Sequence, residues 1–210
     1  YIFVYMKIDD QKIHNDESHA FYFHDLPLLQ KKVSYINRIM GSNEKKKSIR
    51  IKKINTKQNN NKISLDGIKY IVFDFDGVFT DNKVYVDSNG VETIRCDRAD
   101  GMAIDLLRKF INKNNFKVKL LILSTEKDKA TLQRARKLKI NCVRGISNKY
   151  DYLLDRYGTD IFDKICYLGN DINDLDVMKY SRYSVSPLDA HLEIKRMSNF
   201  NLNTLGGQGF

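Results

Sequence analysis

Two aspartates stand where the most strand-like segment of the chain ends. Residues 70–75 form an apolar, β-branched run without alternation, which predicts a strand buried on both faces, and Asp74 and Asp76 lie at its end. Carboxylates spaced in this way face the same general direction, and their repulsion would raise the pKa of one of them unless a cation lies between them. Clustered oxygen ligands suit Mg²⁺, and Gly77 lets the backbone turn sharply beside a ligand. The pair therefore predicts a site for a divalent cation.

Polar residues also follow the next two clear strands. Ser124 comes after the predicted strand 117–123 and before a helix, where a hydroxyl and free backbone N–H groups can bind a phosphoryl oxygen. An ordinary helix N-cap is the alternative interpretation of this serine. After the predicted strand 164–168, the segment Gly169–Asp174 adds amide and carboxylate oxygens. Lys149 opens a helix between these motifs and could supply a cation, or it could be a surface lysine.

From residue 69 onward, predicted strands alternate with predicted helices. Such alternation indicates an α/β fold with a parallel sheet and helices on both faces, in which ligands gather at the carboxyl ends of the strands. Residues 83–87 and 91–96 flank Ser88-Asn89-Gly90, whose residues tolerate positive φ, so this segment is predicted as a β-hairpin. The predicted helices cover residues 99–112, 127–138, 148–157 and 172–180, and a short strand covers 141–143.

Four short segments occur in the order DFDGVFTD, LILS, NK and YLGNDIND. This order resembles the four motifs of the phosphatases of the haloacid dehalogenase (HAD) superfamily. The segments KVYVDSNGVETIRCDRADGMAIDLL, SPLDAH and TLGGQGF are similar to one branch, the capless phosphatases of 8- and 9-carbon keto-sugar acid phosphates. That branch includes 3-deoxy-D-manno-octulosonate 8-phosphate phosphatase and the domain fused behind acylneuraminate (sialic acid) cytidylyltransferases. The resemblance covers residues 66–210 and implies a Rossmann-like fold with a protruding β-hairpin and no large cap.

The resemblance implies a role for each polar residue of the motifs. Asp74 would be the nucleophile that becomes an aspartyl phosphate, and Asp76 would protonate the leaving sugar oxygen and later deprotonate the attacking water. Ser124 and Lys149 would hold the transferring phosphoryl oxygens. Mg²⁺ is the implied cofactor, with ligands drawn from Asp74, Asp76, Asn170, Asp171 and Asp174, and the expected substrate contacts are Thr80, Asp81, Asn148, Glu126 and Lys137.

Two positions depart from the octulosonate phosphatases. Asn170 stands where those enzymes commonly have an aspartate after the glycine, so the metal would depend more on Asp171 or Asp174. Glu126 stands where they have the arginine of Thr-Gly-Arg, and with Lys137 it resembles the branch that acts on nonulosonate 9-phosphates. The alternative is that Glu126 and Lys137 are exposed helix residues. The predicted substrate is therefore a nonulosonate 9-phosphate or a 3-deoxy-D-manno-octulosonate 8-phosphate.

The chain has no segment long enough for a cap, which leaves the site open to water, and the resemblance implies that a neighbouring subunit covers it. The resemblance implies a homotetramer, with the hairpins packed together. Apolar residues would otherwise leave the hairpin exposed, namely Val84, Tyr85, Val86, Val91 and Ile94. The alternative is that the chain is the C-terminal part of an acylneuraminate cytidylyltransferase and serves mainly in assembly, since it begins at Tyr1 and not at a methionine.

Residues 1–65 fall outside the resemblance. Residues 1–43 form an N-terminal segment of undefined role, with the end of an upstream domain as one interpretation. Residues 44–65 are predicted as a basic, Asn- and Lys-rich linker, and nucleic-acid binding is the less favoured alternative because interleaved aromatics are lacking. A charged content of 30% and the lack of a long apolar run exclude a membrane protein. Three cysteines without metal-ligand spacing indicate reduced thiols and a cytoplasmic location.

Overall fold

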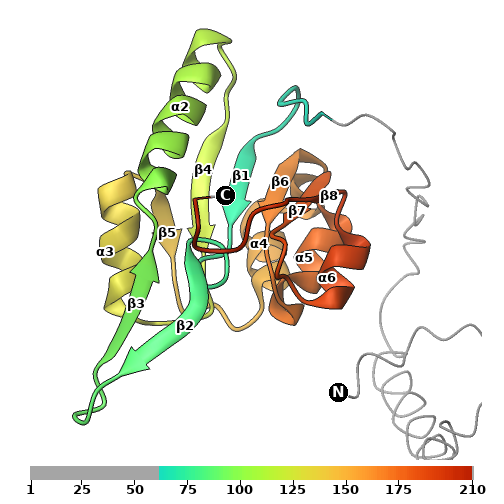
Figure 1. The fold of residues 1–210 in the computed structure, drawn as a ribbon. Helices are drawn as coiled ribbons and strands as arrows, with labels where there is room; N and C mark the ends of the chain where they lie inside the picture. Colours follow the sequence, from blue (N-terminus) through green and yellow to red (C-terminus); the bar gives the residue numbers. More distant parts are fainter. Residues whose placement is uncertain (1–61, 210) are drawn as a thin grey trace, which may run out of the picture. The chain divides into compact units, whose positions relative to one another are not determined.

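A parallel sheet with the strand order β5-β4-β1-β6-β7-β8 runs through the part of the chain that the computed structural model describes, residues 62–209 (Figure 1). Each pairing within this sheet is parallel, and helices cover both of its faces, so the predicted α/β class is confirmed. The strands of the sheet are β1 (Tyr70–Phe73), β4 (Lys119–Leu123), β5 (Asn141–Val143), β6 (Ile165–Leu168), β7 (Tyr183–Ser186) and β8 (Phe200–Asn201). The helices are α2 (Ala99–Lys113), α3 (Lys129–Leu138), α4 (Lys149–Tyr157), η3 (Thr159–Lys164), η4 (Ile172–Asp174), α5 (Leu175–Tyr180) and α6 (Leu192–Met197).

Strand β1 contributes side chains to both hydrophobic cores. Ile71 and Phe73 pack on one face of the sheet with residues of α2 and α3. Val72 packs on the opposite face with residues of α4, α5 and α6. Because successive strand residues point to opposite faces and both faces are covered, the strand reads as a continuous apolar run.

The register of the sheet brings three strand ends to one level. Phe73 of β1 pairs with Ile122 of β4 and with Leu168 of β6. The backbone N–H of Asp74 continues this ladder by donating to the carbonyl oxygen of Leu168 at 2.8 Å. The chain therefore leaves β1, β4 and β6 side by side at the carboxyl edge of the sheet, where ligands bind in folds of this kind.

A separate antiparallel hairpin, formed by β2 (Thr80–Val86) and β3 (Glu92–Cys96), projects from the domain (Figure 1). Its turn is the predicted one, because Asp87 Oδ1 accepts hydrogen bonds from the N–H groups of Asn89 (2.8 Å) and Val91 (2.9 Å). Four of its five apolar side chains are exposed as predicted, by 53% at Val84 and 62% at Tyr85, and likewise at Val86 and Val91. The prediction was wrong for Ile94, which is half-buried against the core beside α2 and α3.

A second row of exposed apolar side chains was not predicted from the sequence. Met102, Leu106 and Phe110 follow one another every four residues along α2, which places them on one face of the helix. They are 65%, 56% and 52% exposed. The hairpin and this row leave more apolar surface uncovered than single scattered residues would.

Four elements of the C-terminal half were missed by the sequence analysis: η3, β7, α6 and β8. Strand β7 has four residues and β8 has two, so neither is long enough to establish a period. Tertiary contacts hold them in place. The side chain of Asn199 accepts hydrogen bonds from the N–H (2.8 Å) and the hydroxyl (3.0 Å) of Ser184.

The predicted N-terminal segment 1–43 and most of the predicted linker lie outside the described residues. Leu65, the last residue of that linker, already belongs to the core beside α2 and α3. Within residues 62–209, none of the helices has the length and hydropathy that a membrane crossing requires.

Candidate active site

A buried cluster of three charged side chains lies at the carboxyl edge of the sheet. Lys149 Nζ is 2.6 Å from Asp74 Oδ1 and 2.7 Å from Asp174 Oδ1. The three side chains are at most 5% exposed. One ammonium thus faces two carboxylates in a place that water hardly reaches, where charges interact strongly. The cluster carries one net negative charge as long as all three groups are ionised.

Burial and this excess of negative charge together account for the pKa shifts of the cluster. Burial raises the pKa of Asp74 well above its usual value, and the neighbouring Asp174 raises it further, against the opposing effect of Lys149. Burial alone would lower the pKa of Lys149, but the two carboxylates outweigh this effect and raise it. Lys149 therefore stays an ammonium, and the unbalanced charge falls on the carboxylates.

Lys149 is buried because of where α4 begins. Asn148 is the N-cap of α4, and its Oδ1 accepts a hydrogen bond from the N–H of Asp151 at 3.1 Å. Lys149 is the first residue of the helix and is only 1% exposed, so the alternative of a surface lysine is wrong. Asn148, a predicted substrate contact, is exposed and uses its side-chain oxygen in the cap.

Asp174 closes the loop that follows β6. Its Oδ2 accepts hydrogen bonds from the N–H groups of Asn170 (3.0 Å) and Asp171 (3.4 Å). Its Oδ1 accepts from Lys149 and from the hydroxyl of the buried Tyr167, both at 2.7 Å. Since both oxygens are held by donors of the protein, Asp174 orients Lys149 and is poorly placed as a free metal ligand. Sequence analysis missed Tyr167 because an aromatic residue in a buried strand reads as core.

Asn170 has a buried side-chain oxygen that could bind a cation. It is 7% exposed, and its Oδ1 is a buried atom without a hydrogen-bond partner in the part of the chain that the structure describes. Such an orphaned acceptor is costly unless something binds it. Its side chain lies against Gly77, where φ is +76° and a Cβ atom would come within 2.9 Å of that same oxygen. The glycine thus allows Asn170 to approach the backbone beside Asp76.

The donors around Asn170 fit a hard divalent cation. Both polar contacts of the Asp74 carboxylate among residues 62–209 fall on Oδ1, which leaves Oδ2 for another partner. Asn170 Oδ1, Asp74 Oδ2 and the backbone carbonyl of Asp76 are oxygen atoms of the type that Mg²⁺ prefers. Within the described residues no group of three or more His, Cys, Asp or Glu side chains could hold a metal. The set around Asn170 has one such side chain, Asp74, and its other two oxygens belong to an amide and a backbone carbonyl. Asp171 is exposed, and its Oδ1 instead accepts from the N–H of Ile172 at 2.7 Å.

Asp76 is held by the loop that leads into the hairpin. The hydroxyl of Thr80 donates to Asp76 Oδ1 at 3.3 Å and accepts from the N–H groups of Gly77 (3.1 Å) and Asn82 (3.2 Å). Burial raises the pKa of Asp76, although the Thr80 hydrogen bond opposes this effect. Thr80, a predicted substrate contact, is fully buried and therefore supports Asp76 instead. Asp81 forms an ion pair of 2.9 Å with Arg95 of β3.

Ser124 is buried directly after β4, and it is not a helix cap. Its Oγ accepts a hydrogen bond from the N–H of Glu126 at 3.1 Å. The N-cap of α3 is Asp128, whose side chain accepts from the N–H of Thr131 at 3.3 Å. The alternative interpretation of Ser124 as an ordinary N-cap is therefore wrong, and α3 begins two residues later than predicted.

The structure does not bring Lys137 to Glu126. Glu126 precedes α3 and Lys137 lies in its last turn, so the length of the helix, roughly 15 Å, separates them. The salt bridges of the described residues join other partners. Lys137 instead lines a hollow of about 490 Å³ between α2 and α3, together with the cationic side chains of Arg98, Arg108 and Arg134.

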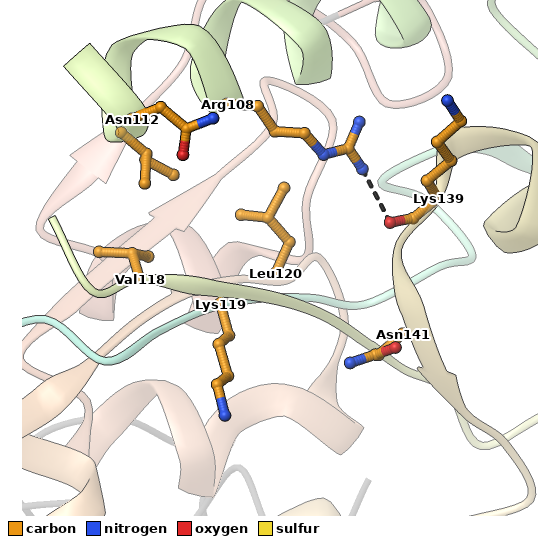
Figure 2. A pocket seen from close by; sticks show the side chains of 8 residues that line it. Arg108, Asn112, Val118, Lys119, Leu120, Lys139 and Asn141 are labelled. Carbon is orange, nitrogen blue, oxygen red and sulfur yellow. Dashed lines mark hydrogen bonds between the residues drawn. The ribbon is translucent and has the colours of Figure 1, made fainter. Parts of the chain in front are cut away.

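A smaller hollow of about 270 Å³ lies at the amino ends of β4 and β5, on the opposite edge of the sheet from Asp74 (Figure 2). Lys119 and Asn141, the first residues of these two strands, contribute to its wall. Arg108 extends across it and donates to the carbonyl oxygen of Lys139 at 2.9 Å. Lys139 is the C-cap of α3, so this bond gives a partner to a carbonyl group that the helix itself leaves without one. This hollow has a structural explanation and lies away from the charge cluster.

Comparison with known proteins identifies the class to which this chain belongs. No family model matches the chain. A solved structure from Streptomyces avermitilis, described as a HAD family hydrolase, is 32% identical, covers 70% of this chain and 82% of its own, and superimposes with a TM-score of 0.61. The chain therefore belongs to the haloacid dehalogenase superfamily, in the branch that resembles 3-deoxy-D-manno-octulosonate 8-phosphate phosphatase.

Two relatives represent that branch. The 3-deoxy-D-manno-octulosonate 8-phosphate phosphatase of Salmonella typhi is 28% identical over 148 residues, which is 69% of this chain and 75% of the relative. The cobalt-bound octulosonate 8-phosphate phosphatase of Haemophilus influenzae is 26% identical, covers 69% of this chain and 83% of its own, and gives a TM-score of 0.58. These relatives are phosphatases, which is consistent with a phosphoric monoester hydrolase.

Proposed function

We propose that the chain is a Mg²⁺-dependent phosphatase that hydrolyses a phosphorylated keto-sugar acid through an aspartyl phosphate. The observation that carries this proposal is the contact of Lys149 with Asp74 at the end of β1, with an orphaned Asn170 oxygen in the neighbouring loop. A domain that served only in assembly would have no need to bury this net charge. The intact cluster thus favours catalysis over a purely structural role.

The residues divide the reaction into two displacements. Asp74 Oδ2 attacks the phosphorus atom, the bond from phosphorus to the sugar oxygen breaks, and Asp76 gives that oxygen its proton. Asp76 then takes a proton from a water molecule, whose oxygen attacks the phosphorus and releases phosphate from Asp74. Lys149 and Ser124 neutralise the phosphoryl oxygens during both steps. Mg²⁺, held by Asp74, Asn170 and the carbonyl of Asp76, would supply further positive charge to these oxygens.

The direct test is phosphate release by the full chain from a panel of sugar-acid phosphates. The panel contains octulosonate, nonulosonate and sialate phosphates, each assayed with Mg²⁺ and with a chelator in excess. We expect turnover of at least one of them with Mg²⁺ and its loss with the chelator. A chain that releases phosphate from none of them would refute the proposal.

The substrate should be decided in part by Glu126. Since its N–H bonds to Ser124 Oγ, this residue lies beside the predicted phosphoryl contact, at the mouth of the site. We propose a nonulosonate 9-phosphate as the substrate, because a carboxylate there accepts hydrogen bonds from the extra hydroxyl groups. Glu126→Arg should shift the ratio of kcat/KM toward octulosonate 8-phosphate by roughly 10–100-fold. Both substrates are assayed with each variant, and an unchanged ratio would mean that Glu126 does not contact the sugar.

We also propose that the chain forms a homotetramer. The apolar hairpin and the row on α2 need a covering surface, and a second copy of the chain is the partner that the branch implies. In such an assembly Lys137 can reach a substrate only in the site of a neighbouring subunit. Its cationic hollow between α2 and α3 would then receive the sugar carboxylate.

Charged substitutions in the hairpin should dissociate this assembly. Tyr85→Lys places an ammonium on the apolar hairpin, and we expect light scattering to report tetramers for the wild type and smaller species for the variant. The control is Asp155→Lys on an exposed position of α4, which should remain tetrameric. A wild-type chain that is monomeric and fully active would contradict both the assembly and the role given to Lys137.

The three cysteines of the chain, Cys96, Cys142 and Cys166, are free thiols. We propose a cytoplasmic location on this ground, since thiols persist in reducing compartments. The basic stretch for which nucleic-acid binding was the less favoured alternative lies largely outside residues 62–209.

A further inference from the structure

The segment that follows β8 crosses the base of the hairpin before the described chain ends (Figure 1). It is anchored first at the loop after β7, where the N–H of Leu188 donates to the carbonyl of Thr204 at 3.0 Å. The N–H of Gly206 then donates to Asp189 Oδ1 at 2.9 Å. Finally, the N–H of Gly207 donates to the carbonyl of Val78 at 3.0 Å. Residues 204–207 thus tie the loop after β7 to the loop after β1.

Gly206 and Gly207 are buried, and the contact they make is too close for any side chain. A Cβ atom on Gly206 would fall well inside van der Waals contact of the carbonyl of Gly77 and lie 3.2 Å from that of Thr80. On Gly207, where φ is +67°, a Cβ atom would also fall well inside van der Waals contact of the backbone nitrogen of Asp81 and lie 2.8 Å from the carbonyl oxygen of Thr80. These neighbours are backbone atoms, so they can yield only if the loop itself moves.

The loop that these glycines contact follows Asp76 directly in the chain. Thr80 links Gly207 to Asp76, because its backbone packs against Gly207 while its hydroxyl donates to Asp76 Oδ1. The same hydroxyl also accepts from the N–H of Gly77, so the loop and the Asp76 side chain are held as one unit. A displacement of Thr80 by a few tenths of an ångström would break a hydrogen bond that is already 3.3 Å long.

We propose that Gly206 and Gly207 are positioning residues for Asp76. Because they have no side chain, they let the backbone of the C-terminal segment pack directly on the Gly77–Asp81 loop and hold that loop in place. The inference rests on the proposed function for its catalytic consequence, since Asp76 is the proton donor to the leaving sugar oxygen. The contact itself does not depend on that function. The two glycines therefore affect the active site indirectly, because they support the backbone of the loop that holds the Asp76 side chain.

The test compares two glycines that differ in their neighbours. Gly207→Ala introduces a Cβ against the loop, whereas Gly158→Ala introduces one at a similar positive φ of +78°, where no heavy atom of the described residues lies within 4 Å. Both substitutions strain the backbone, but only the first displaces Thr80. We expect Gly207→Ala to lower kcat on the sugar-acid phosphate by about 10-fold or more while KM changes little. Gly158→Ala should keep the wild-type kcat.

The leaving group supplies a readout that a general loss of structure would not move. A sugar alkoxide needs protonation as it leaves, whereas p-nitrophenolate does so much less. Asp76 also activates the water of the second step, which both substrates share, so the comparison uses kcat/KM, which reports only the steps up to departure of the leaving group. If Asp76 is misplaced in Gly207→Ala, kcat/KM for the sugar-acid phosphate should fall at least about 10-fold more than kcat/KM for p-nitrophenyl phosphate. An equal loss on both substrates would overturn the proposal.

A milder pair of variants covers the case in which Gly207→Ala does not fold. Asp189 is exposed, so its substitution should not disturb the core. Asp189→Ala removes the acceptor for the N–H of Gly206, whereas Asp189→Asn retains an oxygen in its place. We expect the same selective loss on the sugar-acid phosphate for the alanine variant, in smaller degree, and recovery for the asparagine variant.

Hydrogen–deuterium exchange separates this inference from the proposed function. The peptide that contains residues 75–82 should exchange faster in Gly207→Ala than in the wild type or in Gly158→Ala, whatever the activity of the chain. If the wild type releases no phosphate but this difference is present, the proposed function fails and the support of the loop stands. If exchange of this peptide is the same in all three proteins, the inference fails even when the phosphatase activity is confirmed.

Discussion

Asparagine in place of Asp74 should lower phosphate release from the sugar-acid phosphate at least about 10³-fold. The amide has nearly the shape of the carboxylate, but it cannot attack phosphorus to form the acyl phosphate. The fold should survive, because Lys149 keeps its 2.7 Å contact with Asp174. Removal of one carboxylate from a cluster with excess negative charge should leave the thermal unfolding temperature equal to that of the wild type or raise it.

The control for this variant is Asp155→Asn, the same substitution at an exposed position of α4. It should keep the wild-type rate in the phosphate-release assay. If Asp74→Asn retains near-normal turnover with a verified sequence, Asp74 is not the nucleophile. If it is inactive only because it is unfolded, the unfolding curve will report this directly, and the conclusion about its role will not follow.

Methionine in place of Lys149 should have the largest effect on stability. The substitution leaves Asp74 and Asp174 buried and facing each other without the ammonium that lies within 2.7 Å of both. Loss of one partner from a buried ion pair typically costs about 3–5 kcal/mol, so we expect the free energy of unfolding to fall by an amount of that order. Denaturant titration measures this change, with Lys179→Met on α5 as the control.

The double variant Lys149→Met with Asp74→Asn tests the cause of this loss. Because one of the two uncompensated carboxylates is then neutral, the double variant should be more stable than Lys149→Met alone, although it too should be inactive. If charge is the cause, Asp74→Asn should stabilise the Lys149→Met background by more than it stabilises the wild type, which gives an interaction energy different from zero. Additive effects of the two substitutions, with an interaction energy near zero, would mean that Lys149 stabilises the chain through its packing and not through its charge.

The central part of the fold could be predicted because its signals are local and strong. The residues of β1 that pack into the two cores, Ile71, Val72 and Phe73, are all apolar. The Ser88-Asn89-Gly90 turn has residues that favour the tight turn seen in the hairpin. The position of Asp74 follows from the rule that ligands gather where parallel strands end, whereas the role of Lys149 comes only from the resemblance, and the structure brings both side chains into contact. The short strands β7 and β8 could not be predicted, since their pairing depends on contacts with residues far away in the sequence.

Side-chain roles were harder to predict than side-chain locations. Ser124 and Asp128 both precede α3, and only the observed geometry shows which of them caps it. Thr80 belongs to a motif of substrate contacts, but its burial assigns its hydroxyl to Asp76. The hydrogen bond of Tyr167 to Asp174 could not be predicted from the sequence, because it depends on the pairing of β6 with β1 and on the path of the loop that follows.

The position of β1 between β4 and β6 has a consequence for the kinetics of folding. Tyr70 pairs with Lys119 on one side and with Ile165 on the other, so both edges of this strand wait for partners that are made much later. During synthesis one edge of this strand therefore stays unpaired until β4 has emerged, and the other stays unpaired until the segment up to Leu168 has emerged. Contacts of such long sequence separation fold slowly and expose the chain to aggregation in the meantime. The charge cluster also needs Asp174, so it cannot form before that point. The burial of Asp74 therefore depends on residues that are synthesised about 100 positions later in the chain.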